Sequence, residues 1–149
     1  MSSFKQIIKA ARFAKLAHAG QKRKHGTPYF NHPKAVSRAL WGSGVRDPDL
    51  IAAAYTHDVL EDCQDFAPML KEVLSSKALV LVNAVTRNKG ESYQEYCLRI
   101  KATSSDAVAL KLADVAQNIQ DLKHLPKDDE LHQKLAKKLA IILTVFKHL

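Results

Sequence analysis

The segment LIAAAYTHDVLED, residues 50–62, carries the strongest structural signal in the sequence. Its first half is apolar on nearly every side of a helix, which is typical of a buried central helix. In its second half, His57 and Glu61 are one helical turn apart, and the same spacing separates Asp58 from Asp62. Because uncompensated burial of such charges is costly, the segment predicts a cation or strong polar partners. A satisfied hydrogen-bond network, or a helix end emerging into water, fits the same pattern.

The sequence on either side of this segment also has helical periodicity, and no run alternates with period two for long enough to predict a strand. Pro33 and the Asp47-Pro48 pair are typical of helix starts, and Gly20 and Gly42 of helix ends. We therefore expect one domain over residues 1–149 with an all-α, compact helical-bundle fold. The predicted helices cover residues 4–17, 33–41, 48–62, 66–74, 77–86, 92–101, 106–122 and 128–146.

Composition excludes several classes of protein. The chain has 149 residues, 46% hydrophobic and 26% charged, as in globular domains. Its longest apolar runs are far short of a membrane span, and its first residues lack the features of a secretory signal. Cys63 and Cys97 are too few for a disulfide scaffold. We expect a cytoplasmic protein with no membrane partner.

The positive charge is unevenly distributed. The net charge is +8, yet residues 1–46 contain ten basic residues and no acid, while the remainder contains 13 basic and 15 acidic residues. A one-sided basic field predicts an anionic partner, either a nucleotide or a nucleic acid.

Two further segments carry residues of the same chemistry as residues 57–62. Asp114 and Asn118 are one turn apart on an otherwise apolar helix. His32 precedes Pro33, which holds this imidazole at a helix start. Two imidazoles and two carboxylates from three helices suit a divalent ion of the manganese or iron type. These candidate ligands are His32, His57, Asp58 and Asp114.

The order His…His-Asp…Asp resembles the HD-domain metal phosphohydrolases. Three segments in register make the resemblance more specific: AKLAHAGQKRKHGTPYFNHP at residues 14–33, THDVLED at 56–62, and KLAD at 111–114 followed by Asn118. They are similar to the three signature segments of the hydrolase domain of RelA/SpoT-type alarmone enzymes. The resemblance covers roughly residues 5–125.

This resemblance implies that one Mn²⁺ is held by His32, His57, Asp58 and Asp114. It implies that Glu61 and Asp62 orient or deprotonate the water that attacks phosphorus. Arg23 and Lys24 would contact the nucleotide and its phosphates, and Asn118 the ribose or phosphate side of the pocket. The implied reaction removes the 3′-diphosphate of guanosine tetra- or pentaphosphate (ppGpp or pppGpp), which gives GDP or GTP and pyrophosphate.

The chain departs from the family pattern at Val115 and Gln117, where the family usually has a basic residue and an aromatic or histidine. This departure predicts less positive charge near the substrate phosphates. The adenosine alarmone ppApp and NADPH are therefore alternative substrates.

Two other classes of function fit parts of the sequence. A nucleic-acid-binding domain would use the basic first third, but 7% aromatic content and the acids of the candidate site argue against nucleic acid. A silent nucleotide sensor would not need Glu61 and Asp62. Trp41 is expected in the core or at a homodimer contact. Tyr29 and Phe30 are expected to pack in the core more than to contact ligand. The lysines of the last helix are expected to form a solvated face: Lys134, Lys137 and Lys138.

Overall fold

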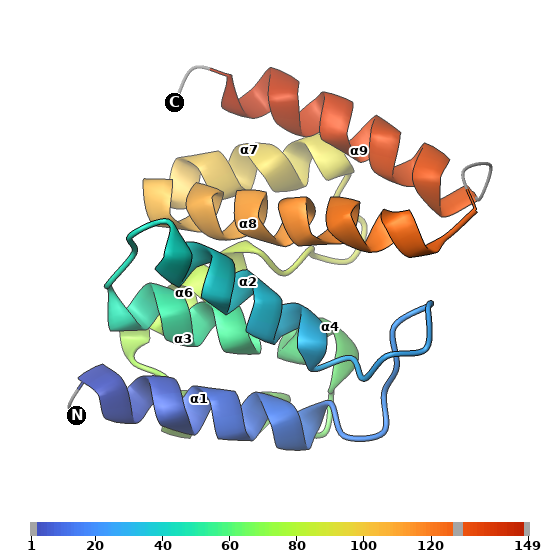
Figure 1. Cartoon of the computed structure of the whole chain (residues 1–149). Helices are drawn as coiled ribbons and strands as arrows, with labels where there is room; N and C mark the ends of the chain where they lie inside the picture. The colour runs from blue at the N-terminus through green and yellow to red at the C-terminus, as the bar shows by residue number, and fades with distance from the viewer. Residues whose placement is uncertain (1–2, 127–129, 148–149) are drawn as a thin grey trace.

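The computed structural model describes residues 3–126 and 130–147, and its architecture is helical throughout (Figure 1). Its longer helices are α1 (Ser3–Ala17), α2 (Asn31–Gly42), α3 (Pro48–Thr56), α6 (Ser76–Ala84), α7 (Tyr93–Thr103), α8 (Ser105–Asp121) and α9 (Glu130–Phe146). Its short turns of helix are α4 (Val59–Asp62), η1 (Ala67–Met69), α5 (Leu70–Val73) and η2 (Leu122–His124). Within the described ranges, bridge pairing is limited to Lys22 and Pro28. The predicted all-α fold is confirmed.

Helix α3 lies at the centre of the molecule. In Figure 1 it runs between α1 on one side and the α7, α8 and α9 group on the other, with α2 and α6 beside it. The apolar side chains of its first two turns are almost fully buried, as their sequence predicts. Helix α9 packs mainly on α7 and along the edge of α8. The fold therefore brings α2, the end of α3 and α8 together in the interior.

Side-chain caps fix several helix starts. The Asp47 carboxylate accepts a hydrogen bond from the Asp49 amide at 2.9 Å, as the Asp-Pro pair predicts. Ser92 and Ser104 cap α7 and α8 in the same way. Helix α2 begins at Asn31, so Pro33 lies in its first turn, where no amide donor is needed.

The predicted continuous helix over residues 48–62 is wrong at one point, since α3 ends at Thr56 and α4 begins at Val59. Asp58 has φ −98° and ψ −2°, a conformation common at turns and active sites. The Ala54 carbonyl accepts a hydrogen bond from Nδ1 of His57, and the Thr56 hydroxyl bonds back to the Ala52 carbonyl. Such side-chain bonds to helix carbonyls bend helices. The break sets the direction of His57 and Asp58 at the centre of the fold.

Several other helix ends differ from the prediction by one or two residues, and two predicted helices need a separate comment. Residues 66–74 form η1 followed by α5 rather than one helix, and Pro68 lies within η1. The predicted start of the last helix at Asp128 lies outside the described residues; the described helix runs over Glu130–Phe146.

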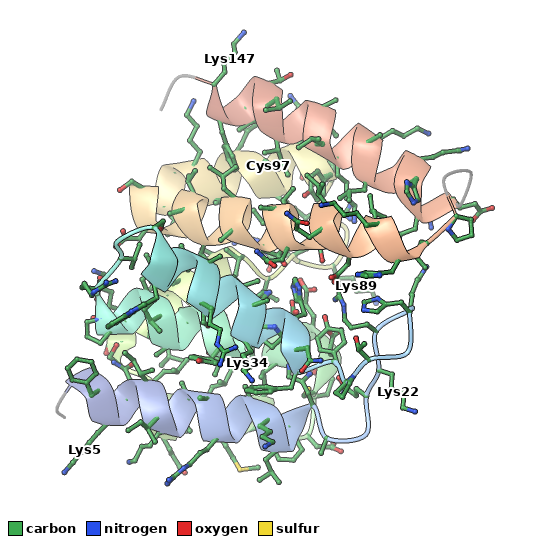
Figure 2. All side chains as sticks on the ribbon, viewed as in Figure 1. Lys5, Lys22, Lys34, Lys89, Cys97 and Lys147 are labelled. Carbon is green, nitrogen blue, oxygen red and sulfur yellow. The ribbon has the colours of Figure 1, made fainter. Side chains whose placement is uncertain are left out.

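Surface and interior side chains are distributed as the composition predicts. Figure 2 shows Lys5 and Lys147 projecting from opposite sides of the molecule, whereas Cys97 is fully buried. Trp41 is not a core residue, because it is 39% exposed and its ring lies 3.8 Å from the Arg46 guanidinium carbon. No helix in the described part of the chain has the length and apolar character needed to cross a bilayer.

Candidate metal centre and phosphate pocket

Four side chains from three regions of the chain converge at the centre of the fold. His32 comes from the first turn of α2, His57 and Asp58 from the break after α3, and Asp114 from the middle of α8. Nε2 of His32 lies 2.7 Å from Oδ1 of Asp114. Nε2 of His57 lies 3.3 Å from the same oxygen and 3.2 Å from Oδ2 of Asp58. The structure thus brings together all four ligands expected from the sequence.

The hydrogen bonds of this cluster fit a divalent cation. The Ala54 carbonyl can only accept, so Nδ1 of His57 carries a hydrogen, and Nε2 is the ring nitrogen available to bind a metal. Nε2 faces one oxygen each of Asp58 and Asp114, so positive charge, from a proton on the ring or from a bound cation, stabilises this arrangement. Backbone bonding of the outer nitrogen is the usual way to orient a metal-binding histidine. His32, His57 and Asp58 place their ligand atoms within 4.8 Å of one another.

The pKa shifts of the cluster residues also indicate that positive charge is needed beside the two buried carboxylates. Burial alone would raise the pKa of Asp114, but the Lys111 ammonium and the two histidines hold it well below its usual range. Burial would lower the pKa of His57, yet Asp58 and Asp114 raise it well above its ordinary value. Both shifts have one cause, since two buried carboxylates demand a compensating cation.

Tyr29 links the loop after α1 to this cluster. Its hydroxyl donates to Oδ2 of Asp58 at 2.8 Å, and its ring stacks on the buried His18 at 4.8 Å between centroids. Burial, with Asp58 and Asp62 nearby, raises the pKa of Tyr29 far above its ordinary value, so the hydroxyl stays a donor. Neither residue lies in the core: Phe30 is half-buried and stacks on Tyr55, and Tyr29 lines both cavities described below. The sequence signal for the contact between Tyr29 and the cluster was the position of Tyr29, three residues before His32.

Glu61 and Asp62 lie on α4, directly after the cluster. Oε1 of Glu61 accepts the Arg87 amide hydrogen at 2.9 Å, and the side chain lines the same cavity as His32 and Asp58. Burial and the Asp58 charge raise the pKa of Glu61. Asp62 is exposed, as Glu61 is, and burial and Asp58 raise its pKa too, but its side chain does not line that cavity. The two carboxylates are adjacent in the sequence and were expected to act together, but only Glu61 lines the cavity.

Two adjoining cavities lie at or beside the cluster. The first, which we call the metal-site cavity, measures about 290 Å³ and is lined by His32, Asp58, Glu61 and Asp114, among others. The second, which we call the basic pocket, measures about 350 Å³ and lies between residues 22–29, α8 and α9. The two cavities adjoin, because six residues line both of them: Arg23, Tyr29, Tyr93, Lys111, Asn118 and Lys138.

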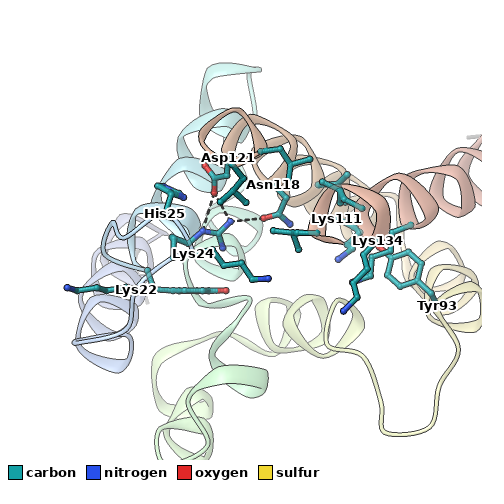
Figure 3. Close-up of a pocket in the computed structure, with 16 residues that line it drawn as sticks. Lys22, Lys24, His25, Tyr93, Lys111, Asn118, Asp121 and Lys134 are labelled. Atoms are coloured by element: carbon teal, nitrogen blue, oxygen red, sulfur yellow. Dashed lines mark hydrogen bonds and ion pairs between the residues drawn. The ribbon is translucent and has the colours of Figure 1, made fainter. Parts of the chain in front are cut away.

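The expected nucleotide contacts Arg23, Lys24 and Asn118 all line the basic pocket. Nε and Nη2 of Arg23 donate to Oδ2 of Asp121 at 3.1 and 2.6 Å, and Nη2 also donates to Oδ1 of Asn118 at 3.0 Å (Figure 3). Sequence reasoning missed Asp121, although it follows Asn118 by three residues on one face of α8. The loop that carries Arg23 is therefore hydrogen-bonded to α8 at the edge of the pocket.

Basic side chains of α8 and α9 also enter these cavities. Nζ of Lys111 lies 3.1 Å from Oδ2 of Asp114, so it pairs with a site carboxylate. Figure 3 shows Lys134 of α9 on the side of the basic pocket opposite Lys24. Lys138, one turn later, lines both cavities. The expected solvated face is confirmed, because Lys134, Lys137 and Lys138 are all exposed; Lys134 and Lys138 also border the cavities.

Comparison with known proteins adds family relationships to this geometry. A sequence model described as an HD domain matches residues 10–149. The chain is 35% identical over 150 residues to a guanosine-3′,5′-bis(diphosphate) 3′-pyrophosphohydrolase of Aquifex aeolicus, a match that covers 96% of this chain and 21% of that protein. It is 33% identical over 128 residues to the protein MESH1 of Danio rerio, named for the same activity, with 81% of this chain and 71% of that protein covered.

The overall fold is similar to a solved structure described as a metazoan orthologue of SpoT that hydrolyses ppGpp. The TM-score is 0.74 at 24% identity, and the match covers 96% of this chain and 94% of that one. This likeness concerns the fold. The chain spans only about a sixth to a fifth of the length of the longer bacterial relatives that it matches.

Proposed function

Because this chain belongs to the HD domain family and is a relative of the MESH1 guanosine-3′,5′-bis(diphosphate) 3′-pyrophosphohydrolases, we propose that it hydrolyses ppGpp or pppGpp at the 3′ position. The products would be GDP or GTP and pyrophosphate. One observation carries the proposal: a cluster of two imidazoles and two carboxylates opens into a pocket lined with cations. In this proposal residues 1–149 act as one domain in the cytoplasm, where they break down the alarmone of the stringent response.

The metal in this proposal is one Mn²⁺, held by His32, His57, Asp58 and Asp114. Nitrogen and carboxylate ligands without thiolates favour a metal of this type over a structural zinc. When bound, the ion supplies Lewis-acid polarisation of a phosphoryl oxygen and positive charge for the transition state. The Ala54 carbonyl and the Tyr29 hydroxyl orient His57 and Asp58 towards it.

Glu61 is the group best placed to take a proton from the attacking water. The Arg87 amide holds Oε1, and Oε2 of the same carboxylate remains to accept the proton. A pKa raised by burial and by Asp58 makes this carboxylate a stronger base. Asp62 would act beside it by orienting the water. The new bond joins the water oxygen to phosphorus, the bond from phosphorus to the ribose 3′ oxygen breaks, and that oxygen takes up a proton.

The basic pocket would hold the rest of the nucleotide. Arg23 and Lys24 supply charge for phosphate, and Asn118 supplies an amide for the sugar or phosphate. Val115, Leu122 and Leu135 add apolar surface suited to a base or ribose. At position 115 the wall is apolar where the family usually has a basic residue, which keeps ppApp and NADPH as alternative substrates.

A nucleotide panel tests the proposal. The protein with Mn²⁺ is incubated with ppGpp, pppGpp, ppApp and NADPH, and the products are separated by anion exchange. We expect pyrophosphate from ppGpp and pppGpp at the highest rate. Turnover confined to ppApp or NADPH would move the substrate assignment and keep the chemistry. Nucleotide binding without any turnover in Mn²⁺ would favour a sensor instead.

A further inference from the structure

His18 lies directly after the end of α1 and is 2% exposed. Its ring stacks on the Tyr29 ring, with 4.8 Å between the centroids and 28° between the ring planes. Nδ1 of His18 lies 2.9 Å from Oε1 of Gln21 and 3.3 Å from Sγ of Cys63, the residue that follows α4. His18, Gln21 and Cys63 line neither of the two cavities. These three side chains therefore reach the site only through other residues.

Gln21 connects three parts of this region. Its Nε2 donates to the Asp62 carbonyl at 3.1 Å, which fixes the orientation of the amide and turns Oε1 towards His18. Because Oε1 can only accept, Nδ1 of His18 carries the hydrogen of the bond between them. The Gln21 carbonyl also accepts the Tyr29 amide hydrogen at 2.8 Å. Gln21 thereby joins the end of α1, the end of α4 and the segment that carries Tyr29.

Packing alone does not account for a histidine at position 18. Nε2 of His18 is buried and has no hydrogen-bond partner within residues 3–126 and 130–147. A buried polar atom without a partner costs free energy that an apolar ring would avoid. Compared with an apolar ring, His18 adds the Nδ1 hydrogen that Gln21 accepts. Compared with a small polar side chain, it adds the flat ring that stacks on Tyr29.

We propose that His18 and Gln21 are positioning residues of the metal centre, which hold Tyr29 where its hydroxyl orients Asp58. The Tyr29 hydroxyl donates to Oδ2 of Asp58 at 2.8 Å, so a displaced ring would take this hydrogen away from the ligand. The bond from Gln21 to the Asp62 carbonyl holds the same support against the end of α4. The inference rests on the proposed function, because it needs a metal at the four-residue cluster.

Two substitutions test this role. His18→Asn removes the ring and keeps a side-chain N–H near the position of Nδ1. Gln21→Met removes both side-chain hydrogen bonds and keeps an unbranched chain. Because Gln21 is only half-buried, this variant keeps the test decisive if His18→Asn does not fold. Gln6→Met is the matched control, since Gln6 is a buried amide on α1 that donates to Asp49, in the first turn of α3.

The readout is Mn²⁺ affinity without nucleotide, measured by competition with a chromophoric chelator. We expect His18→Asn to lower the affinity about five- to tenfold and Gln21→Met about threefold, because both act on the metal ligand through Tyr29. In a Tyr29→Phe background, either substitution should change the affinity by less than about twofold, since the hydroxyl that they position is already absent. Gln6→Met should lower the melting temperature and leave Mn²⁺ affinity unchanged.

Three results would overturn the proposal. The first is Mn²⁺ affinity equal to that of the wild type in either folded variant. The second is an equal loss of affinity with and without the Tyr29 hydroxyl. The third is the same loss in Gln6→Met, which would mean that general destabilisation of α1 weakens the metal site.

The same measurements separate this inference from the proposed function. Mn²⁺ binding that depends on His18 through Tyr29, in a protein that hydrolyses no nucleotide, would support the positioning role and remove the enzymatic assignment. Turnover of ppGpp, with Mn²⁺ affinity indifferent to His18 and Gln21, would keep the enzyme and remove the positioning role.

Discussion

The Tyr29 hydroxyl donates a hydrogen bond of 2.8 Å to Oδ2 of Asp58, 29 residues further along the chain. This bond joins the basic loop to the metal cluster, and the Arg23 guanidinium carbon lies 5.3 Å from the centroid of the same ring. One side chain therefore orients a metal ligand and supports a group that is proposed to bind phosphate.

Tyr29→Phe removes this bond while keeping the ring. We expect Mn²⁺ affinity to fall about 10- to 100-fold, the usual effect of losing a hydrogen bond to a metal ligand. Competition with a chromophoric chelator measures it. Tyr55→Phe is the control, since Tyr55 is a half-buried ring that stacks on Phe30. Unchanged Mn²⁺ affinity in Tyr29→Phe would show that the Tyr29 hydroxyl does not orient Asp58 for metal binding.

Bound metal should stabilise the fold through the four-residue cluster. At Mn²⁺ one hundred times above its Kd, the free energy of unfolding should increase by about 2.7 kcal/mol. For a chain of this length, that corresponds to a rise in melting temperature of roughly 5–10 °C, measured by calorimetry with and without chelator. Asp58→Ala and Asp114→Ala should abolish the rise. A metal-dependent rise that persists in both variants would locate the ion elsewhere.

Asp121 is expected to position Arg23 for substrate. Asp121→Asn removes the ion pair of 2.6 Å between Oδ2 and the guanidinium and leaves a side chain of equal size. Because both partners are partly exposed, the pair is worth about 1 kcal/mol, so KM for ppGpp should rise about fivefold with little change in kcat. Asp65→Asn, an exposed site, is the control. A lower KM would mean instead that Asp121 competes with phosphate for Arg23.

Acid should weaken the connection between α6 and α7, which carries Arg87. Hydrogen bonds from Arg99, with the Asn88 amide and the nearby Arg87 charge, lower the pKa of Glu91 from 4.5 to about 2. A lowered pKa means that the stabilisation is complete above the ordinary value and is lost as pH falls from about 4.5 to about 2. The wild type should therefore exceed Glu91→Gln in free energy of unfolding by about 1 kcal/mol at pH 7.

Denaturant titrations at pH 7, 4 and 2.5 measure this difference between wild type and Glu91→Gln. The difference should narrow with each step. Because Arg99 also donates to the carbonyls of Asn83, Ala84 and Thr86, Arg99→Ala should destabilise the protein even at the lowest pH. A difference between wild type and Glu91→Gln that is independent of pH would contradict the assigned ion pair.

Local signals in the sequence account for most of the fold. Ser92 and Ser104 lie where their hydroxyls cap helices, and the apolar residues of α3 are buried as their pattern predicts. The convergence of His32 with Asp114 was also expected, because three polar segments interrupt apolar helices and need each other as partners. The helix caps depend on residues close in sequence. The convergence of the cluster follows from the high free-energy cost of burying polar groups without partners.

Other features depend on tertiary packing, which periodicity does not report. The break at His57 and Asp58 is stabilised by side-chain bonds to backbone carbonyls, and helical spacing continues across it. The pairing of Arg23 with Asp121 joins residues 98 positions apart. The entry of Lys138 into the metal-site cavity depends on how α9 is rotated against α7 and α8. None of these has a local sequence signal.

The central claim is that the four-residue cluster supports hydrolysis of ppGpp at its 3′ position. The most direct test measures pyrophosphate release from ppGpp with Mn²⁺ by the wild type and by Asp58→Ala, with circular dichroism to show that the variant is folded. We predict pyrophosphate and GDP in equal amounts from the wild type and none above background from Asp58→Ala. Equal rates from both proteins, or no pyrophosphate from the wild type, would contradict the claim.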